Sequence, residues 1–232
     1  MPPRLTGLAA AAGALRLWEQ KQELIAHNLA NANTTGFKAE RSFAQLLGDV
    51  TPVLGTRTDL SGGAVRTTGN PLDLALEGDG FLVVGTPNGE RLTRGGELRL
   101  DDTNRLVTTD GHPVLGAHGE IRVPPKTAEL VIGRDGTIAA DGRPLGRLRL
   151  EGVPPDAPLA RDGAGRWIPG ATRPPAAGVR VRQGALEESN VNPIATLVDM
   201  ITAQRAYASI QKAVTTMDAV RSTAVTDLGR PV

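Results

Sequence analysis

Residues 193–228 form the longest uninterrupted helical pattern in this chain and constrain its fold more than any other feature. The pair Asn192-Pro193 favours a helix start, because an Asn side chain can cap the first turn and Pro tolerates the first helical position. No Gly and no second Pro follow within the stretch. Apolar residues recur there at alternating three- and four-residue steps, which is the heptad pattern of a coiled-coil seam. This stripe consists of Met200, Ala203, Tyr207, Ile210, Val214, Met217 and Ala224, with a gap at Arg221.

A second heptad stripe lies near the N-terminus, where residues 4–32 are expected to form a helix. Its polar member, Gln22, can fix the register of a helix pair at some cost in stability. Because one narrow stripe on a long helix needs a partner, we predict that the two terminal helices meet as a coiled coil. The alternative is that both helices pack against a central sheet. The N-terminal stripe consists of Leu8, Ala11, Leu15, Trp18, Gln22, Ile25 and Leu29.

A structured turn is predicted where the first helix ends. Asn and Gly tolerate a positive φ, and Asn and Thr side chains bond to nearby backbone, so these residue types favour a fixed turn. Asn31, Asn33, Thr35 and Gly36 build the turn, and Phe37 follows as an apolar anchor. Residues 37–58 show only a weak pattern and are interpreted as a connector.

Between residues 59 and 185 the apolar period changes from heptad to two, which indicates short strands. Pairs of Asp or Asn with Gly, which favour tight hairpin turns, separate the apolar segments. The region is therefore interpreted as a mostly antiparallel all-β domain, and the fold class of the whole chain as α+β. Residues 152–178 are rich in Pro and Gly and are expected to form a long surface loop or a flexible edge of this domain.

Composition argues against several classes of function. The chain contains no Cys, which excludes disulfides, thiol catalysis and Cys-ligated metals. Its three His residues lack metal-ligand spacing, so we expect no metal site. A formal net charge of +1 gives no field for nucleic acid, and 3% aromatic residues are too few for base stacking. We therefore expect no catalytic residue, no cofactor, and neither nucleic acid nor a small-molecule ligand as a partner.

Four motifs, in order along the chain, carry a resemblance to a known family. The stretch Asn-Leu-Ala-Asn-Ala-Asn-Thr-Thr-Gly-Phe-Lys-Ala resembles the N-terminal signature of the flagellar basal-body rod and hook proteins. Two later stretches resemble motifs of their central domain, and the last resembles their C-terminal signature. The chain departs from the usual pattern at Leu82, Leu92 and Asn104-Arg105. The matching segments are residues 28–39, 72–81, 93–98 with 106–116, and 186–193 with 200–207.

The resemblance implies a structural subunit of the flagellar rod, not an enzyme. Its expected partners are other copies of itself, other rod proteins and the flagellar type III export apparatus. Its expected location is the periplasmic rod, reached without a cleaved signal peptide. Subunits would stack helically around a hollow channel and transmit torque, since head-to-tail contacts between unlike surfaces generate an open filament. Residues 68–73 and the modest length are more similar to the proximal-rod branch than to the distal-rod branch, which remains the alternative.

Within this expectation, residues 1–36 and 186–232 are two parts of one helical rod-core domain, and residues 59–185 are a central β domain. The competing hypotheses are a secreted binding module with helical arms and an enzyme. The first lacks an exposed aromatic platform, and the second lacks any catalytic grouping. The two stripes supply the candidate assembly interface: Leu8, Leu15, Trp18, Ile25, Leu29, Met200, Ala203, Tyr207, Ile210, Val214 and Met217.

Overall fold

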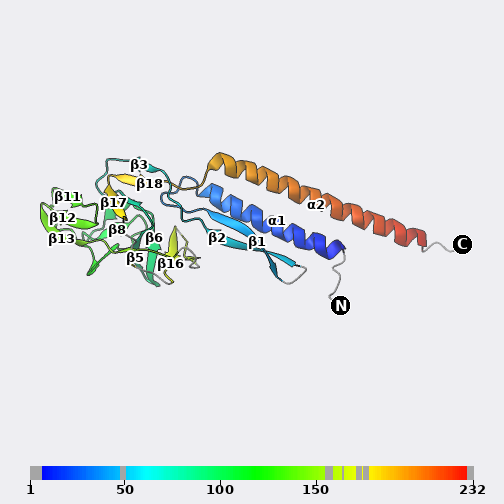
Figure 1. Cartoon of the computed structure of the whole chain (residues 1–232), viewed down its shortest axis with the longest axis horizontal. Coiled ribbons are helices and arrows are strands. Elements are labelled where there is room, and N and C mark those ends of the chain that lie inside the picture. The colour runs from blue at the N-terminus through cyan, green and yellow to red at the C-terminus, as the bar shows by residue number, and fades with distance from the viewer. Residues whose placement is uncertain are drawn as a thin grey trace. The chain divides into compact units, whose positions relative to one another are not determined.

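The computed structural model describes residues 7–47, 51–154, 159–163, 165–170, 174 and 178–228 (Figure 1). The chain divides into two compact units. The helical unit takes in the chain up to residue 30, residues 40–57 and the chain from residue 192 onward. The β unit comprises residues 31–39 and 58–191. Each unit therefore combines a segment from early in the sequence with one from late in the sequence.

Two antiparallel helices dominate the helical unit. Helix α1 (Gly7–Ala30) and helix α2 (Pro193–Leu228) lie side by side, as Figure 1 shows. Helix α2 begins where its capping sequence predicts, because the Asn192 Oδ1 atom accepts a hydrogen bond from the Ala195 backbone N–H at 3.1 Å. Both helices lie within about three residues of the bounds expected from their sequence patterns.

A two-stranded sheet completes the helical unit. Strands β1 (Glu40–Leu47) and β2 (Thr51–Thr58) form in the segment interpreted as a connector, and β1 contacts α1. Asn28 fastens the sheet to the helix, because its side-chain amide donates to the Glu40 carbonyl at 2.8 Å and accepts from the Glu40 N–H at 2.9 Å. The phenyl ring of Phe43 lies over Gly55, where any Cβ atom would approach the ring to 2.4 Å.

The largest sheet of the β unit has five antiparallel strands in the order β14-β5-β6-β16-β15. The Pro- and Gly-rich segment, expected to be a loop or an edge, supplies β15 and β16. Trp167 on β16 is fully buried and contacts Phe81 edge to face, with ring centroids 5.5 Å apart. The strands are β5 (Phe81–Thr86), β6 (Gly89–Thr93), β14 (Leu150–Glu151), β15 (Ala160–Arg161) and β16 (Arg166–Ile168).

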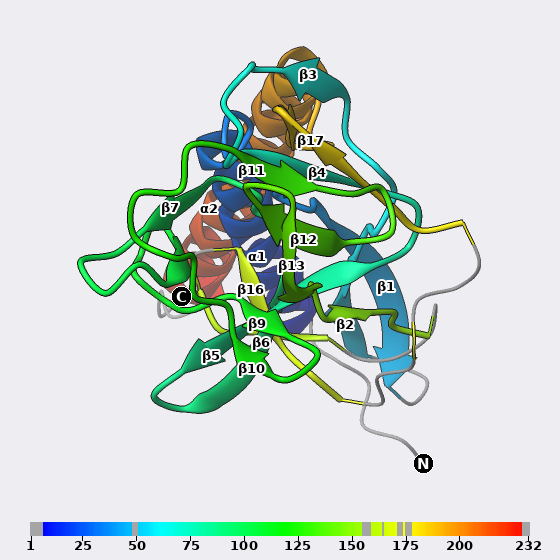
Figure 2. The same ribbon diagram turned by 90° about the vertical axis from the view of Figure 1, so that its left-hand side faces the viewer.

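The β unit also contains smaller antiparallel sheets, among them the one formed by β11, β12 and β13 (Figure 2). A three-stranded sheet has the order β11-β12-β13, with a register shift between Ile138 and Ala139. Two hairpins pair β7 with β8 and β9 with β10. The strands are β7 (Leu98–Leu100), β8 (Leu106–Thr108), β9 (Leu115–Gly116), β10 (Gly119–Glu120), β11 (Leu130–Ile132), β12 (Thr137–Ala140) and β13 (Arg143–Arg147).

Two further strand pairs join the first and last parts of the β unit. Strand β3 (Val65–Thr67) pairs with β18 (Ala185–Glu187), and β4 (Leu74–Glu77) pairs with β17 (Arg180–Gln183). The expected alternation is absent in β4, where three successive residues are buried. This strand is covered on both faces, so its sequence pattern cannot reveal a polar side.

The expected tight turns are mostly present. Gly89, Gly111, Gly136, Gly142 and Gly163 all have a positive φ, as hairpin glycines require. The pair Asp79-Gly80 differs, because Gly78 and not Gly80 has the positive φ. Two buried apolar clusters fill the unit, one around Leu82, Leu106 and Ile138 and the other around Phe81 and Trp167.

Candidate assembly interface

The two apolar stripes meet between α1 and α2. The Gln22 Nε2 atom donates to the Ala203 carbonyl at 3.3 Å, and the Tyr207 hydroxyl donates to the Glu19 carboxylate at 3.0 Å. From the first of these contacts to the second, the residue number falls on α1, from 22 to 19, and rises on α2, from 203 to 207. The two helices are therefore antiparallel, and these contacts define their register. The polar stripe residue therefore bonds to the facing helix, as a register-setting residue should.

Burial along the stripes follows this pairing. Ile25 and Ala203 are 6% and 0% exposed, whereas Met217, near the end of α2, is 45% exposed. The side chain of Leu8 lies outside the residues that the structure describes. The structure thus brings the two stripes together within one chain, and their contact with neighbouring chains stays a prediction. The half-buried members are Ala11, Leu15, Trp18, Gln22, Leu29, Met200, Tyr207, Ile210 and Val214.

A second apolar surface lies on the opposite side of α2. Its residues are largely exposed: Ile194 at 78%, Leu197 at 50%, Val198 at 57% and Ile201 at 44%. They follow the i, i+3, i+4, i+7 spacing of one helix face. Sequence reasoning followed only the longer stripe and missed this shorter one. We call these four residues and the helix face that they begin the outer face of α2.

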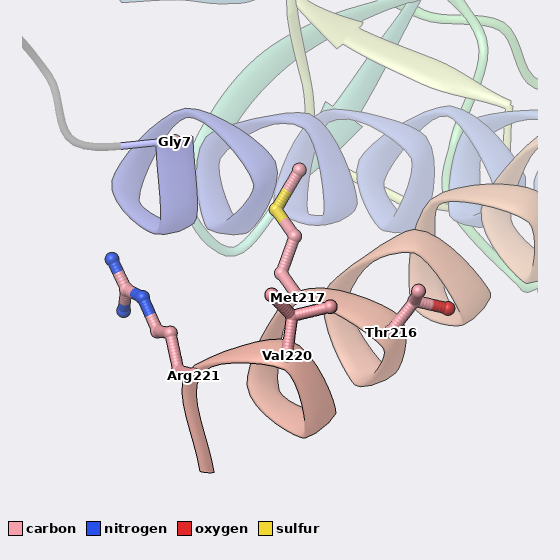
Figure 3. A pocket seen from close by; sticks show the side chains of 5 residues that line it. All are labelled: Gly7, Thr216, Met217, Val220 and Arg221. Atoms are coloured by element: carbon pink, nitrogen blue, oxygen red, sulfur yellow. The ribbon is translucent and has the colours of Figure 1, made fainter. Parts of the chain in front are cut away.

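A shallow apolar cleft of about 310 Å³ lies between the start of α1 and the end of α2 (Figure 3). Figure 3 shows the Met217 side chain extending toward α1 and the Arg221 guanidinium lying near the first turn, below Gly7. Gly7 leaves room there, because a Cβ atom built on it would meet nothing within 4 Å. The heptad gap at Arg221 therefore falls at the edge of this cleft and not inside a closed seam. The remaining lining residues are Thr216 and Val220.

The predicted structured turn lies in the β unit. Gly36 has a φ of 66°, and its N–H donates to the Glu187 carbonyl at 2.7 Å. Phe37 is 2% exposed, with the Arg161 guanidinium 4.7 Å from its ring centroid, whereas Asn33 is exposed and both Asn31 and Thr35 are half-buried. The last two residues of the turn, Gly36 and Phe37, therefore attach it to the rest of the β unit.

Directly after the turn lies a buried ionic cluster that the sequence did not reveal. We define it by Lys38, Arg94 and Glu187. The Lys38 Nζ atom lies 2.5 Å from one Glu187 carboxylate oxygen, and an Arg94 Nη1 atom lies 3.2 Å from the other. The three side chains are between 0% and 3% exposed. A single carboxylate therefore faces two cations and joins three distant parts of the chain.

Further hydrogen bonds surround the ionic cluster, although the buried Arg94 Nε atom has no hydrogen-bond partner among the residues that the structure describes. Lys38 also donates to the Ser61 carbonyl at 2.6 Å, and Arg94 donates to the carbonyls of Leu76 and Gly78 at 3.1 and 2.5 Å. Burial lowers the pKa of Lys38 and of Arg94, and the hydrogen bond and charge of Glu187 oppose that shift. Buried charges persist only when they are paired in this way.

Asn190 ties the same region together beyond the ionic cluster. Its Oδ1 atom accepts from the Ala39 N–H at 2.7 Å, and its Nδ2 atom donates to the carbonyls of Asp59 and Ser61 at 2.9 and 3.1 Å. The segment that follows the turn is therefore bonded to the segment that precedes α2. These two segments are the N- and C-terminal sequence motifs themselves.

Neither a metal centre nor a membrane span is found in the part of the chain that the structure describes. No group of three or more metal-binding side chains gathers among those residues. None of the helices described there has the length and apolar character needed to cross a bilayer.

Three family models match the chain. Residues 8–38 match "Flagella basal body rod protein", residues 75–140 match "Flagellar hook protein FlgE/F/G D1 domain", and residues 182–227 match "Flagellar basal body rod FlgEFG protein C-terminal". The first and last of these contain most of α1, the structured turn, Glu187 and nearly all of α2.

Whole-length relatives agree with these models. The chain is 36% identical over 221 residues to the flagellar basal-body rod protein FlgF of Rhizobium meliloti, covering 88% of this chain and 90% of the relative. It is 36% identical over 233 residues to FlgF of Escherichia coli K12, covering 90% and 92%. It is 29% identical over 254 residues to the rod protein FlgG of Bacillus subtilis, covering 93% and 96%.

Proposed function

Because the chain belongs to the flagellar basal-body rod protein family and is a structural subunit of the rod, we propose that its helical unit joins subunits to one another. Family membership places the protein in the flagellar basal body, where it assembles with other rod components and contributes to motility. The observation that carries the proposal is the outer face of α2, whose four large apolar side chains are 44–78% exposed. Burial of such a face against another subunit would be favourable at about 25 cal/mol per Å² of apolar surface.

In this proposal the two stripes form a contact within each subunit and do not themselves contact the neighbouring subunit. They hold α1 and α2 together as a coiled coil, and the resulting helix pair presents its outer surfaces to neighbours. The stripe residues, Leu15 and Ile210 among them, would support assembly by fixing the shape of the pair. Because one face of the pair differs from another, contacts between unlike faces would extend into an open helical rod.

The finer placement of the subunit also belongs to the proposal. The identity to FlgF proteins, 36% in two species, exceeds the 29% identity to a FlgG protein, which favours the proximal rod position. We further propose that the chain reaches the periplasm through the type III export apparatus without a cleaved signal. There its helix pairs would line the channel and transmit torque through their contacts.

The proposal is tested by charging the outer face of α2. We expect Ile201→Glu to abolish swimming and to remove the subunit from isolated basal bodies, because each docked copy would bury an unpaired carboxylate. Gln211→Glu is the matched control, because it introduces the same side chain at an exposed position of α2 outside this face, and it should assemble normally. Circular dichroism of both purified proteins should match the unmodified protein. If Ile201→Glu assembles as well as Gln211→Glu, the outer face of α2 is not the subunit contact.

A further inference from the structure

Helix α1 has three distinct sides. One side carries Ile25 and Gln22 against α2, and a second carries Asn28 against β1. The third side is exposed along its whole length, at alternating four- and three-residue steps. We call it the open side of α1, and its residues are Ala12, Arg16, Glu19, Glu23, Ala26 and Ala30.

The outer face of α2 repeats the same spacing. Beyond Val198 and Ile201 it continues through the exposed residues Arg205, Ala208 and Lys212. Among the described residues, neither Arg205 nor Lys212 forms an ion pair, and Glu23 on the open side of α1 forms none either. Each helix therefore presents an exposed stripe that is apolar at one end and charged in the middle.

We propose that the open side of α1 in one copy docks antiparallel on the outer face of α2 in a second copy. The inference rests on the proposed function and names the partner surface for it. Aligning the two stripes places Glu23 against Arg205. The alanines then fall opposite the large apolar residues, with Ala26 against Ile201 and Ala30 against Val198.

The fit is complementary in charge and in size. Unpaired charges of opposite sign meet, and small alanines leave space for branched side chains between two closely packed helices. Glu19 meets Ala208 and keeps its hydrogen bond to Tyr207 of its own chain. Arg16 is a mismatch, because it falls opposite Lys212, and Ile194 and Leu197 extend past Ala30, where α1 ends. Because the two docking surfaces differ, the contact does not close on itself and can repeat from copy to copy.

A charge swap tests the alignment directly. We expect Arg205→Glu and Glu23→Arg, made singly, each to lower the number of rods per cell by about tenfold or more, because like charges across an interface are strongly unfavourable. The double variant carries both changes in every copy and should restore swimming. Lys212→Glu is the matched control. It reverses the same charge on the same face and should be tolerated, since it removes the mismatch with Arg16.

Cross-linking gives a second readout that does not depend on motility. The chain contains no Cys, so Ala26→Cys combined with Ile201→Cys introduces the only two thiols. These positions lie on sides of α1 and α2 that do not face each other, so a disulfide between them should form between copies. Oxidised basal bodies should yield covalent multimers of this chain, whereas each single-Cys variant should yield none.

The outcomes separate this contact from the proposed function. If the charge swap fails to rescue and no multimers form, although Ile201→Glu blocks assembly, the outer face of α2 docks elsewhere and only the alignment is overturned. Disulfides that join this chain to a different rod protein would also overturn the choice of a second copy. If Ile201→Glu assembles normally, the proposal that the outer face of α2 joins subunits is itself wrong.

Discussion

The ionic cluster of the β unit and the helix pair of the helical unit are held together in opposite ways. The ionic cluster uses a few directional contacts in a dry site, where Lys38, Arg94 and Glu187 are almost completely buried. The helix pair uses a long stripe of half-buried apolar side chains with few specific hydrogen bonds. A directional buried contact fails completely when one member is lost, whereas an apolar stripe loses stability in proportion to the area removed.

This difference shows where the chain needs accuracy and where it can adapt. The ionic cluster and the Gly36–Glu187 hydrogen bond connect the turn at Gly36 to the strand that contains Glu187 through short, directional contacts. The helix pair leaves two sides open, at α1 and at α2, and neighbouring subunits can use these. Accuracy in the β unit and open surfaces in the helical unit together suit a subunit of a repeating structure.

The largest effect is expected from the ionic cluster. Glu187→Ala leaves two buried cations without their carboxylate, and we expect the free energy of unfolding to fall by about 3–5 kcal/mol. Glu188→Ala is the control, because its ion pair with Arg66 is exposed and such pairs contribute only about 0–1 kcal/mol. Urea denaturation followed by circular dichroism measures both. If both variants lost the same free energy of unfolding, the buried ionic cluster would contribute no more to stability than an exposed ion pair.

An intermediate effect is expected at the turn itself. Gly36→Ala would bring a Cβ atom to 2.4 Å from the Arg94 backbone at a positive φ, and we expect a loss of about 2–4 kcal/mol. Gly69→Ala is the control for backbone strain alone, because its φ is 77° and no atom lies within 4 Å of the added Cβ. The midpoint temperature of thermal unfolding should be clearly lower for Gly36→Ala than for Gly69→Ala. The reverse order would show that the close approach to Arg94 can relax.

The smallest effect is expected in the helix pair. Val214→Asp puts a carboxylate at a half-buried stripe position, and we expect a loss of about 1–3 kcal/mol confined to the helical unit. Hydrogen exchange should rise in α1 and α2 while protection of β5 and β6 stays unchanged. Thr215→Asp, the exposed neighbour, should have less effect. Loss of protection in β5 and β6 would mean that the two units are not independent.

Local sequence signals predicted much of the helical unit and many turns. The start of α2 follows from the side-chain chemistry of Asn192, and five hairpin glycines follow from their Asx-Gly context. The approximate extents of both helices were also predictable, because a heptad pattern is a property of the sequence alone. The exposed stripe at Ile194 and Ile201 carried an equally clear helical period, although the longer stripe obscured it.

Long-range contacts were beyond the reach of these signals. A single Lys or Glu in a sequence gives no sign that it will be buried, because its partner is chosen by the tertiary fold. Glu187 lies on β18, which pairs with β3, and its carbonyl accepts from the Gly36 N–H, so its contact with Lys38 depends on chain segments far apart in the sequence. Trp167 sits in a Pro- and Gly-rich segment, and its place in the central sheet depends on pairing with Leu92 far earlier in the chain. Strand β1 also contacts α1, and the weak apolar pattern of its segment gives no sign of that contact.

The nesting of early and late segments has a consequence for how the chain matures. Strands β3 and β4 and the side chain of Lys38 find their strand and ion-pair partners only after residue 179, as the pairs β3–β18, β4–β17 and Lys38–Glu187 show. A chain that emerges from the ribosome N-terminus first can fold its middle early, because β5 to β8 pair with close sequence neighbours. Strands β3 and β4, and Lys38, must wait for the last third of the chain, and such distant pairings close slowly. These strands are therefore made early in each new molecule and acquire their native pairing late.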